Sequence, residues 1–240
     1  SKNKQKFIKS LGLKKFRDAE QLFIAEGPKV VGDLMGHYPC QILAGTSEYL
    51  SSHPEFKAQE ICEITQKELE QISQLKTPRD VIAIFSQQKT GDFALLPNFQ
   101  KDLVLVLDDI QDPGNLGTII RIADWFGIKA IFATKDTVDV FNPKVVQATM
   151  GAILRVKVHY TNDLARLLDT AADSGKPIYG TLLDGDNIYN AKLENRGIVV
   201  MGNEGRGITD ETRKALTHRL LIPPYPADVP TSESLNVAMA

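Results

Sequence analysis

The stretch that decides the fold is LVLVLDDIQDPGNLGTIIR, residues 103–121. Its first five residues, Leu103–Leu107, form a continuous apolar run, which is typical of a strand buried on both faces of a parallel sheet. The following Asp112-Pro113-Gly114-Asn115 is a turn signal, and Ile119–Phe126 is a helix-like stretch. A strand, a turn and a helix in this order begin a β–α–β unit.

The rest of the second half continues this alternation. We expect strands at residues 130–134, 155–159, 178–183, 197–201 and 219–222, and helices at 143–149 and 162–174. Such alternation predicts an α/β domain with a parallel sheet. Ligands of these sheets bind beyond the carboxyl ends of the strands, so the residues that follow each strand are the candidates for a functional site.

The first hundred residues predict a separate, smaller α/β unit. We expect strands at residues 23–26 and 81–86, and helices at 4–17, from Pro28 onward and at 66–75. Short apolar runs lie at residues 41–44 and 60–64. Between residues 87 and 102 the chain turns to Gln, Lys, Gly, Pro and Asn. The sequence therefore predicts one domain over residues 1–98 and a second over residues 99–240.

Composition excludes several classes of protein. The 240 residues are 42% hydrophobic and 24% charged, as in soluble globular proteins, and no apolar run approaches the roughly 18 residues that a membrane span needs. The N-terminus has lysines but no apolar region behind them, unlike a secretory signal. Cys40 and Cys62 are the only cysteines and have no metal-ligand spacing. We therefore expect a reducing compartment, the cytoplasm, and neither disulfides nor zinc.

The N-terminal segment is strongly basic although the net charge of the chain is −2. Residues 1–17 contain no acidic side chain and seven basic ones: Lys2, Lys4, Lys6, Lys9, Lys14, Lys15 and Arg17. Clustered cations gain affinity for nucleic acid by releasing counterions. A solvated, partly frayed helix has the same composition, so both interpretations stay open.

Two polar residues follow the first strand of the second domain. Asn115 and Arg121 flank Gly117, which permits close approach of the backbone, and the five donors of an arginine suit phosphate. The alternatives are a turn asparagine and a surface arginine paired with Asp124 or Asp112. The nearby Asp108, Asp109 and Asp112 have no further acidic cluster beside them, so turn and cap roles are favoured over a metal site.

Two further stretches follow later strands. Gly202–Gly207 reads GNEGRG, a loop that lets backbone groups line a ligand, with Glu204 and Arg206 embedded in it. A tight turn would explain its glycines but not these two charges. The second stretch, Ser234–Asn236, comes after a proline-rich loop, Pro223 to Pro230, and is also compatible with the cap of a final helix near Val237.

Together these stretches resemble the motifs of the SpoU/TrmH family of RNA 2′-O-ribose methyltransferases, part of the SPOUT superfamily. The pattern N-x-G-x-x-x-R matches at Asn115–Arg121, G-N-E-G-x-G at Gly202–Gly207, and I-P…S-L-N-V at Ile222, Pro223 and Ser234–Val237. The first domain is similar to the substrate-binding domain of the family, with F-I-A-E-G-P-K at Phe23–Lys29. The order of the motifs makes the combined match far more specific than any one of them.

The resemblance implies a catalytic domain with a C-terminal trefoil knot, a homodimer with sites at the subunit interface, and S-adenosylmethionine as cofactor. Backbone groups at Gly202, Ile222 and Leu235 would hold the cofactor, with the strand end at Thr181–Leu183 as a further wall. No metal and no membrane are implied. The family continues with a further helix beyond the position of Ala240, and the loop from Pro223 is longer here than in its relatives.

The implied reaction is 2′-O-methylation of a ribose in structured RNA, and ribosomal RNA is favoured over transfer RNA. The resemblance makes Arg121 the base, but a guanidinium resists deprotonation. We therefore expect Arg121 to orient the target phosphate and to lower the effective pKa of the hydroxyl. Asn115, Glu204, Ser234 and Asn236 would complete the catalytic site. The main alternative is a non-catalytic RNA-binding protein on a methyltransferase fold; a nucleotide-binding oxidoreductase would need a G-x-G-x-x-G fingerprint.

Overall fold

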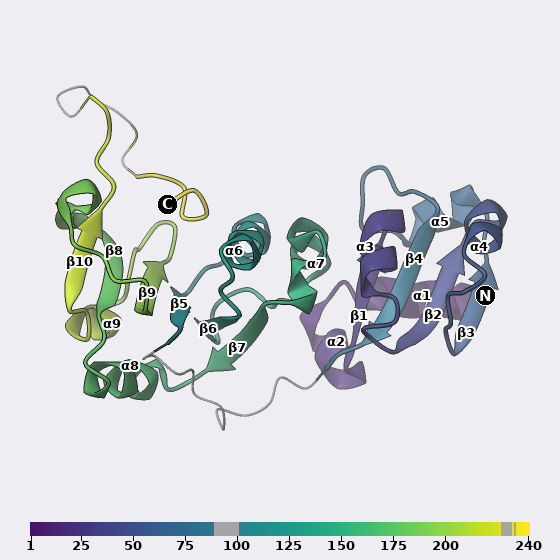
Figure 1. Ribbon diagram of the computed structural model, residues 1–240. Coiled ribbons are helices and arrows are strands. Elements are labelled where there is room, and N and C mark those ends of the chain that lie inside the picture. Colours follow the sequence, from purple (N-terminus) through teal and green to yellow (C-terminus); the bar gives the residue numbers. More distant parts are fainter. Residues whose placement is uncertain (89–100, 227–231, 233) are drawn as a thin grey trace. The chain divides into compact units, whose positions relative to one another are not determined.

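The computed structural model describes residues 1–88, 101–226, 232 and 234–240, and the chain divides into two compact units (Figure 1). The first unit comprises Ser1–Lys89 and Asp139–Leu154, and the second comprises Thr90–Val138 and Arg155–Ala240. Each unit has a sheet of its own. Among the helices of the described ranges, none has both the length and the apolar character that a bilayer crossing requires.

The second unit is built on a six-stranded sheet with the order β10-β8-β9-β5-β6-β7. Every neighbouring pair is parallel, which confirms the predicted α/β domain. Its strands are β5 (Leu103–Asp108), β6 (Ala130–Thr134), β7 (Lys157–Thr161), β8 (Ile178–Asn187), β9 (Gly197–Gly202) and β10 (His218–Leu221). Its helices are α6 (Pro113–Trp125), α8 (Leu164–Asp173), α9 (Asp210–Lys214) and the 3-10 turn η2 (Ile188–Asn190).

The core of this unit follows from the alternation of side chains along β5. Val104 and Val106 pack against Leu167 and Leu168 of α8 on one face of the sheet. Leu105 and Leu107 point to the other face, because successive side chains of a strand alternate. The chain moves through the sheet in opposite directions in β5–α6–β6 and in β7–α8–β8, so right-handed crossovers place α6 and α8 on opposite faces.

The structure corrects the predicted start of α6. The stretch from Asp112 is not a turn before a later helix: α6 begins at Pro113, and the Asp112 carboxylate accepts a hydrogen bond from the Asn115 amide at 2.8 Å. Asp and Pro are well suited to these two positions at a helix start. Arg121 therefore lies more than two turns into the helix, about 12 Å along its axis. The expected strand end at Thr181–Leu183 is also wrong, since β8 continues to Asn187.

The first unit has a four-stranded sheet with the order β1-β4-β2-β3. Only β2 and β3 are parallel. The strands are β1 (Leu22–Glu26), β2 (Cys40–Gly45), β3 (Glu60–Glu63) and β4 (Val81–Ser86). The helices are α1 (Lys2–Ser10), α2 (Lys14–Glu20), α3 (Pro28–Leu34), α4 (Ser47–Ser52), α5 (Gln66–Ile72), α7 (Pro143–Thr149) and the 3-10 turn η1 (Ala152–Leu154).

The basic N-terminal segment forms two helices rather than the single predicted one. The break falls at Leu11–Leu13, where Leu11 is fully buried and Gly12 has Gln74 so close that a Cβ would meet it at 3.1 Å. Glycine is a poor helix former, and Leu13 has the extended backbone of a helix N-cap. Packing of Leu11 and close approach at Gly12 therefore end α1 before α2 begins.

Phe23 explains why a segment from the middle of the chain belongs to the first unit. Ile24 of β1 packs with Ile8 of α1 on one face of the sheet. Phe23, on the other face, contacts the rings of Tyr38, Phe85 and Phe141 at centroid distances of 5.2, 5.7 and 4.8 Å. Aromatic packing of Phe141, together with contacts of α7 with β1, attaches Asp139–Leu154 to this sheet.

Candidate active site

The candidate site lies where β5 and β9 end side by side in the second unit. The two strands are paired along their length, and Asp108 is opposite Gly202 at their carboxyl ends. The chain leaves β5 toward β6, whereas β9 lies on the side of β8. Ligands of open parallel sheets bind at such a reversal of strand order. The loops after β5 and β9 are therefore held together at the position that the topology favours for a ligand.

Glu204 joins the two loops. One of its carboxylate oxygens accepts a hydrogen bond from the Asn115 side-chain amide at 2.9 Å and from the Asp112 backbone amide at 3.3 Å. The other oxygen is 3.4 Å from the backbone amide of Gln111. Residues 89 positions apart in the sequence thus meet, as the motif order predicted.

These hydrogen bonds determine the charge of Glu204. Partial burial raises the pKa of its carboxyl group, but the Asn115 amide and the backbone amides of Glu204, Asp112 and Gln111 outweigh this effect. The pKa is lowered overall from its ordinary value of 4.5. Glu204 is therefore ionised at neutral pH and acts as an acceptor rather than as an acid.

Asn236 extends the same network. Its side-chain amide donates to the side-chain oxygen of Asn115 at 3.0 Å, and its own oxygen accepts from the Ala238 amide at 2.9 Å. Asn115 therefore receives a hydrogen bond from the third motif while it donates one to the second. The structure brings together three of the five predicted catalytic residues: Asn115, Glu204 and Asn236.

Arg121 shares α6 with Asn115 but stands apart from this network. It is exposed, and within the described ranges no carboxylate or other partner contacts its guanidinium. The expected surface partners are both engaged elsewhere. Asp124 forms a bidentate ion pair with Arg155, with nitrogen–oxygen distances of 2.7 to 3.0 Å, and Asp112 caps α6. Arg121 is thus available for a ligand.

The glycine-rich loop has one glycine that the fold requires and one that it does not. A Cβ on Gly202 would lie 2.3 Å from backbone atoms of Gly207 and Ile208, so only glycine fits there. A Cβ on Gly205 would meet only the Asn203 side chain, at 3.7 Å, an ordinary contact. Gly205 is exposed. The exposed backbone at Gly205 is therefore a surface that a ligand can approach closely.

The remaining predicted residues are not part of the hydrogen-bonded group. Ile222, directly after β10, is half-buried, whereas Ser234 and Leu235 are exposed and are not hydrogen-bonded to Asn115 or Glu204. The second half of the proline-rich loop, residues 227–230, lies outside the described part of the chain. For the loop, only its start can be described.

Sequence reasoning missed three residues that shape the site. Asp108 accepts hydrogen bonds from the backbone and hydroxyl of Thr209, at 2.9 and 2.7 Å. Asp109 and Asn203 bond to each other across the two loops, at 2.8 Å through the Asp109 carbonyl. The only sequence signal was their place directly after buried strands. The three aspartates that resembled a metal cluster thus have three separate bonding roles, and the described residues hold no group of metal ligands.

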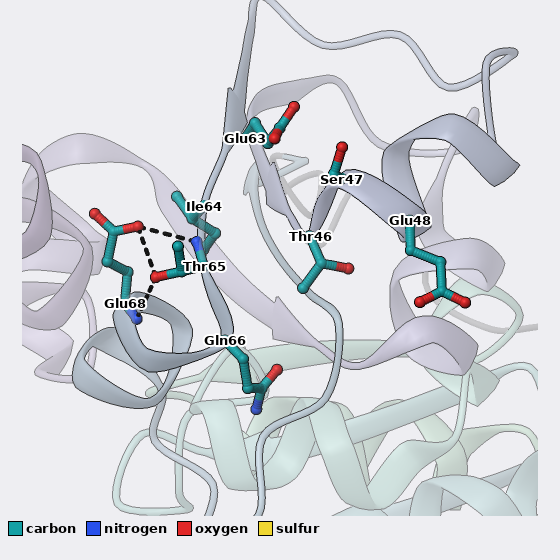
Figure 2. A pocket seen from close by; sticks show the side chains of 8 residues that line it. All are labelled: Thr46, Ser47, Glu48, Glu63, Ile64, Thr65, Gln66 and Glu68. Carbon is teal, nitrogen blue, oxygen red and sulfur yellow. Dashed lines mark hydrogen bonds between the residues drawn. The ribbon is translucent and has the colours of Figure 1, made fainter.

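A separate cavity of about 400 Å³ lies in the first unit (Figure 2). It opens where β2 and β3 end, beside the N-caps Thr46 and Thr65, and three of its lining residues are glutamates: Glu48, Glu63 and Glu68. Figure 2 shows Glu68 turned to Thr65 in a capping box. Carboxylates repel phosphate, so this cavity does not suit an RNA backbone, and we place the candidate site in the second unit.

Comparison with known proteins agrees with the motifs. Residues 102–240 match the model of the SpoU rRNA Methylase family, and residues 2–83 match that of the MRM3-like substrate binding domain. The chain is 28% identical over 252 residues to the 23S rRNA (guanosine(2553)-2′-O)-methyltransferase RlmP of Bacillus subtilis, covering 99% of this chain and 92% of that one. Other curated relatives match over 58% of this chain, and the matched segment spans about half of their length, 49% and 54% in two cases.

Solved structures share the architecture of both units. A TrmH-family protein from Porphyromonas gingivalis is 39% identical, with a TM-score of 0.86 over 100% of this chain and 94% of that one. An AdoMet-bound rRNA methyltransferase from Sinorhizobium meliloti is 28% identical, with a TM-score of 0.81 over 98% and 89% of the two chains. The α/β fold with a preceding substrate-binding domain is therefore that of these enzymes.

Proposed function

Because the chain belongs to the SpoU rRNA methylase family, we propose that it transfers a methyl group from S-adenosylmethionine to a ribose 2′-oxygen of ribosomal RNA. The observation that carries the proposal is the convergence of Asn115, Glu204 and Asn236, together with Arg121 on the same helix as Asn115, which has no partner among the described residues. Three separate motifs supply these residues. The activity of the Bacillus subtilis relative, a 23S rRNA 2′-O-methyltransferase, supports ribosomal RNA as the substrate, and the AdoMet-bound relative supports the cofactor.

The residues of the loops fit a cofactor that is bound mainly by backbone. Gly202 ends β9 and Ile222 directly follows β10, and Gly205 exposes bare backbone in the loop after β9. We assign Leu235 to the same cofactor site from the family pattern. S-adenosylmethionine supplies an electrophilic methyl group on a sulfonium. As the bond from the 2′-oxygen to this carbon formed, the carbon–sulfur bond would break with its electron pair left on sulfur, S-adenosylhomocysteine would leave, and the hydroxyl proton would pass to water. The protein must hold the two groups in line, which lowers the barrier by several kcal/mol.

Arg121 is the residue to which we assign the RNA. Its guanidinium carries five donors and no acceptor, so it suits the binding of the phosphate next to the target ribose better than it suits the role of a general base. A fixed cation there favours the developing negative charge on the 2′-oxygen. Asn115, held between Glu204 and Asn236, would orient the ribose, and Ser234 would lie on the approach to it.

A homodimer is part of the proposal. At the end of α6, Trp125 is 86% exposed and Phe126 73% exposed, with Ile122 beside them. Large apolar groups gathered on one helix end are typical of an association surface. Arg121 is one turn from Trp125 on the same helix face, so a second copy that covered Trp125 would also approach Arg121. Trp125→Glu should shift the sedimenting species from dimer to monomer; an unchanged dimer would refute this surface.

Two further features follow from the family relation alone. We propose a trefoil knot in the segment after β10 and a cytoplasmic location, because both are general in the enzymes that the motifs resemble. The knot is supported by the likeness of the fold to the solved relatives. An electron-density map of the complete chain would show whether the last segment passes through the loop before it.

The test of the proposed function is transfer of tritium from labelled S-adenosylmethionine to ribosomal RNA. We expect transfer by the unaltered protein and a loss of about 100-fold or more in Arg121→Ala, with cofactor affinity nearly unchanged. Arg166→Ala is the matched control, because Arg166 is exposed on α8 and its side chain has no partner among the described residues.

The outcomes separate the two candidate functions. Cofactor-dependent transfer by the unaltered protein with near-normal turnover by Arg121→Ala would remove Arg121 from the mechanism. RNA binding without any transfer would instead support the alternative, a non-catalytic RNA-binding protein on this fold.

A further inference from the structure

We propose that Asp109 is a positioning residue for methyl transfer, which fixes the glycine-rich loop Gly202–Gly207 through Asn203 and Arg206. The inference rests on the proposed function and deepens it, because it identifies what holds the cofactor loop in place before any ligand arrives. Asp109 lies directly after β5 and is 7% exposed.

The backbone of Asp109 is in an unusual conformation. Its φ angle is +64°, in the left-handed region that residues other than glycine, asparagine and aspartate rarely adopt. Its amide donates to the Thr134 hydroxyl at 2.9 Å at the end of β6. A residue persists in such a conformation only where its surroundings fix it, and such positions gather at functional sites.

The Asp109 carboxylate is fully engaged. One oxygen accepts from the Gln111 side chain at 2.9 Å on its own loop. The other accepts from the Asn203 side chain at 3.1 Å and from the guanidinium of Arg206. A buried carboxylate with an ion pair and two amide donors is a strong anchor, because charge-assisted hydrogen bonds are stronger than neutral ones. Arg206 is thereby committed to the clamp, although 73% of its side chain is exposed.

Asn203 connects Asp109 to the rest of the glycine-rich loop. Its amide nitrogen bonds both the carbonyl and the carboxylate of Asp109, while its oxygen accepts from the amides of Gly205 and Arg206 at 2.9 and 3.0 Å. Paired backbone bonds between Asn203 and Gly207, at 3.0 and 2.9 Å, close the turn. The direction of the Gly205 backbone is therefore set from the end of β5.

The clamp is reciprocal. Asp109 on the β5 loop holds the β9 loop, and Glu204 on the β9 loop holds Asn115 and the backbone of the β5 loop. Between the two contacts lies Gly205, whose open side we assigned to the ligand. Loss of Asp109 should leave the strands intact but let Gly205 and Glu204 move together. Preorganisation of this kind acts on cofactor affinity and on the alignment of the reacting groups.

The test compares Asp109→Gly with Asp109→Asn. Glycine adopts a positive φ without strain, so Asp109→Gly removes the clamp without a backbone penalty. We expect the KM for S-adenosylmethionine to rise about tenfold with a fall in kcat, the KM for RNA to stay within about twofold, and amide hydrogen exchange at Gly205 and Arg206 to accelerate. Asp109→Asn, which keeps an acceptor oxygen and tolerates this φ, should restore most of each value.

Asp136→Gly is the control, since Asp136 is exposed in the turn after β6 and bonds to no described residue. Unchanged KM, kcat and exchange rates in Asp109→Gly would overturn the proposal. If Asp109→Gly fails to fold, Arg206→Ala removes one arm of the clamp from an exposed side chain and must still raise the KM for the cofactor and the exchange at Gly205. If the unaltered protein transfers no methyl group, the proposed function fails, while the exchange rates still decide whether Asp109 holds the loop.

Discussion

The two charged residues of the site, Arg121 and Glu204, have different roles. Glu204 is surrounded by donors from its neighbours, whereas Arg121 is exposed and has no partner among the described residues. A carboxylate whose hydrogen bonds are all made stabilises the two loops, whereas a guanidinium without a partner can bind an anion. The division explains why a chain with a net charge of −2 can still present a local cation to RNA.

The lowered pKa of Glu204 predicts a pH dependence. Because its folded-state pKa lies below the unfolded value of 4.5, its hydrogen bonds contribute stability that is complete above about pH 4.5 and is lost as the pH falls through the folded pKa. Denaturant unfolding of the unaltered protein and of Glu204→Gln, from about pH 7 down to about pH 3, should show the difference between them shrinking in acid. A difference that is constant with pH would contradict an ionised Glu204.

Single residues also show where sequence reasoning stops. The motifs pointed to Asn115, Glu204 and Asn236, which the structure joins in one hydrogen-bond network because residues after parallel strands converge at one edge. Their catalytic roles stay a prediction. They did not reveal Asp109, since its left-handed backbone and its bond to Asn203, 94 positions away, depend on the packed sheet. The placement of Ser234 and Leu235 beside this network stays a prediction.

Among the secondary-structure elements, the helices bear functional side chains, and the strands determine where those helices lie. Arg121 and Trp125 come from α6, which begins at Pro113 because Asp112 caps it. Strands β4 and β6 agree with the sequence prediction to the residue, because each is an apolar run with clear polar ends. The start of α6 was harder to predict, because the same Asp-Pro-Gly pattern is compatible with a turn and with a cap, and only the packing of the following residues decides.

Helix α1 presents a row of unpaired lysines that we expect to contact RNA. Lys2, Lys6 and Lys9 are exposed at a spacing that places them on one face, and no described residue pairs with them. Neutralising all three to glutamine should lower the slope of log affinity against log salt by about 2. Filter binding of ribosomal RNA over a range of salt concentrations measures this slope.

The control for this row changes the net charge by the same amount. Arg155, Lys176 and Arg213 lie outside the first unit and are already paired with Asp124, Glu194 and Asp184, so their replacement by glutamine should leave the slope nearly unchanged. Equal effects of the two triple variants would show that only net charge matters. An unaltered slope in both would exclude α1 as an RNA contact.

At the scale of the whole molecule, the chain contributes to its two units discontinuously. Asp139–Leu154 belongs to the first unit, although it lies between β6 and β7 of the second. Besides the contact of Phe141 with Phe23, Arg17 bonds Asp139 through Nε and Nη2 at 2.9 and 2.7 Å and the carbonyls of Leu11 and Gly12 at 2.9 Å. This pair spans 122 positions in sequence, so no local pattern could predict it.

Arg17 should therefore contribute to the stability of the first unit. It is 1% exposed, and Arg17→Met would leave the Asp139 carboxylate without its partner, at a cost of about 3 to 5 kcal/mol in the free energy of unfolding. The double variant Arg17→Met with Asp139→Leu should recover much of this loss. Breaking the exposed pair of Arg155 with Asp124 should cost about 1 kcal/mol or less. Equal losses at the two pairs would contradict a buried anchor.

Methylation of a ribose in ribosomal RNA can be tested in cells by one measurement. It is a map of 2′-O-methylation across ribosomal RNA from cells with and without this gene, read from the resistance of methylated positions to alkaline cleavage. The account predicts that one position loses its methyl group without the gene and regains it with the unaltered protein but not with Arg121→Ala. An identical map in all of these cells would contradict it.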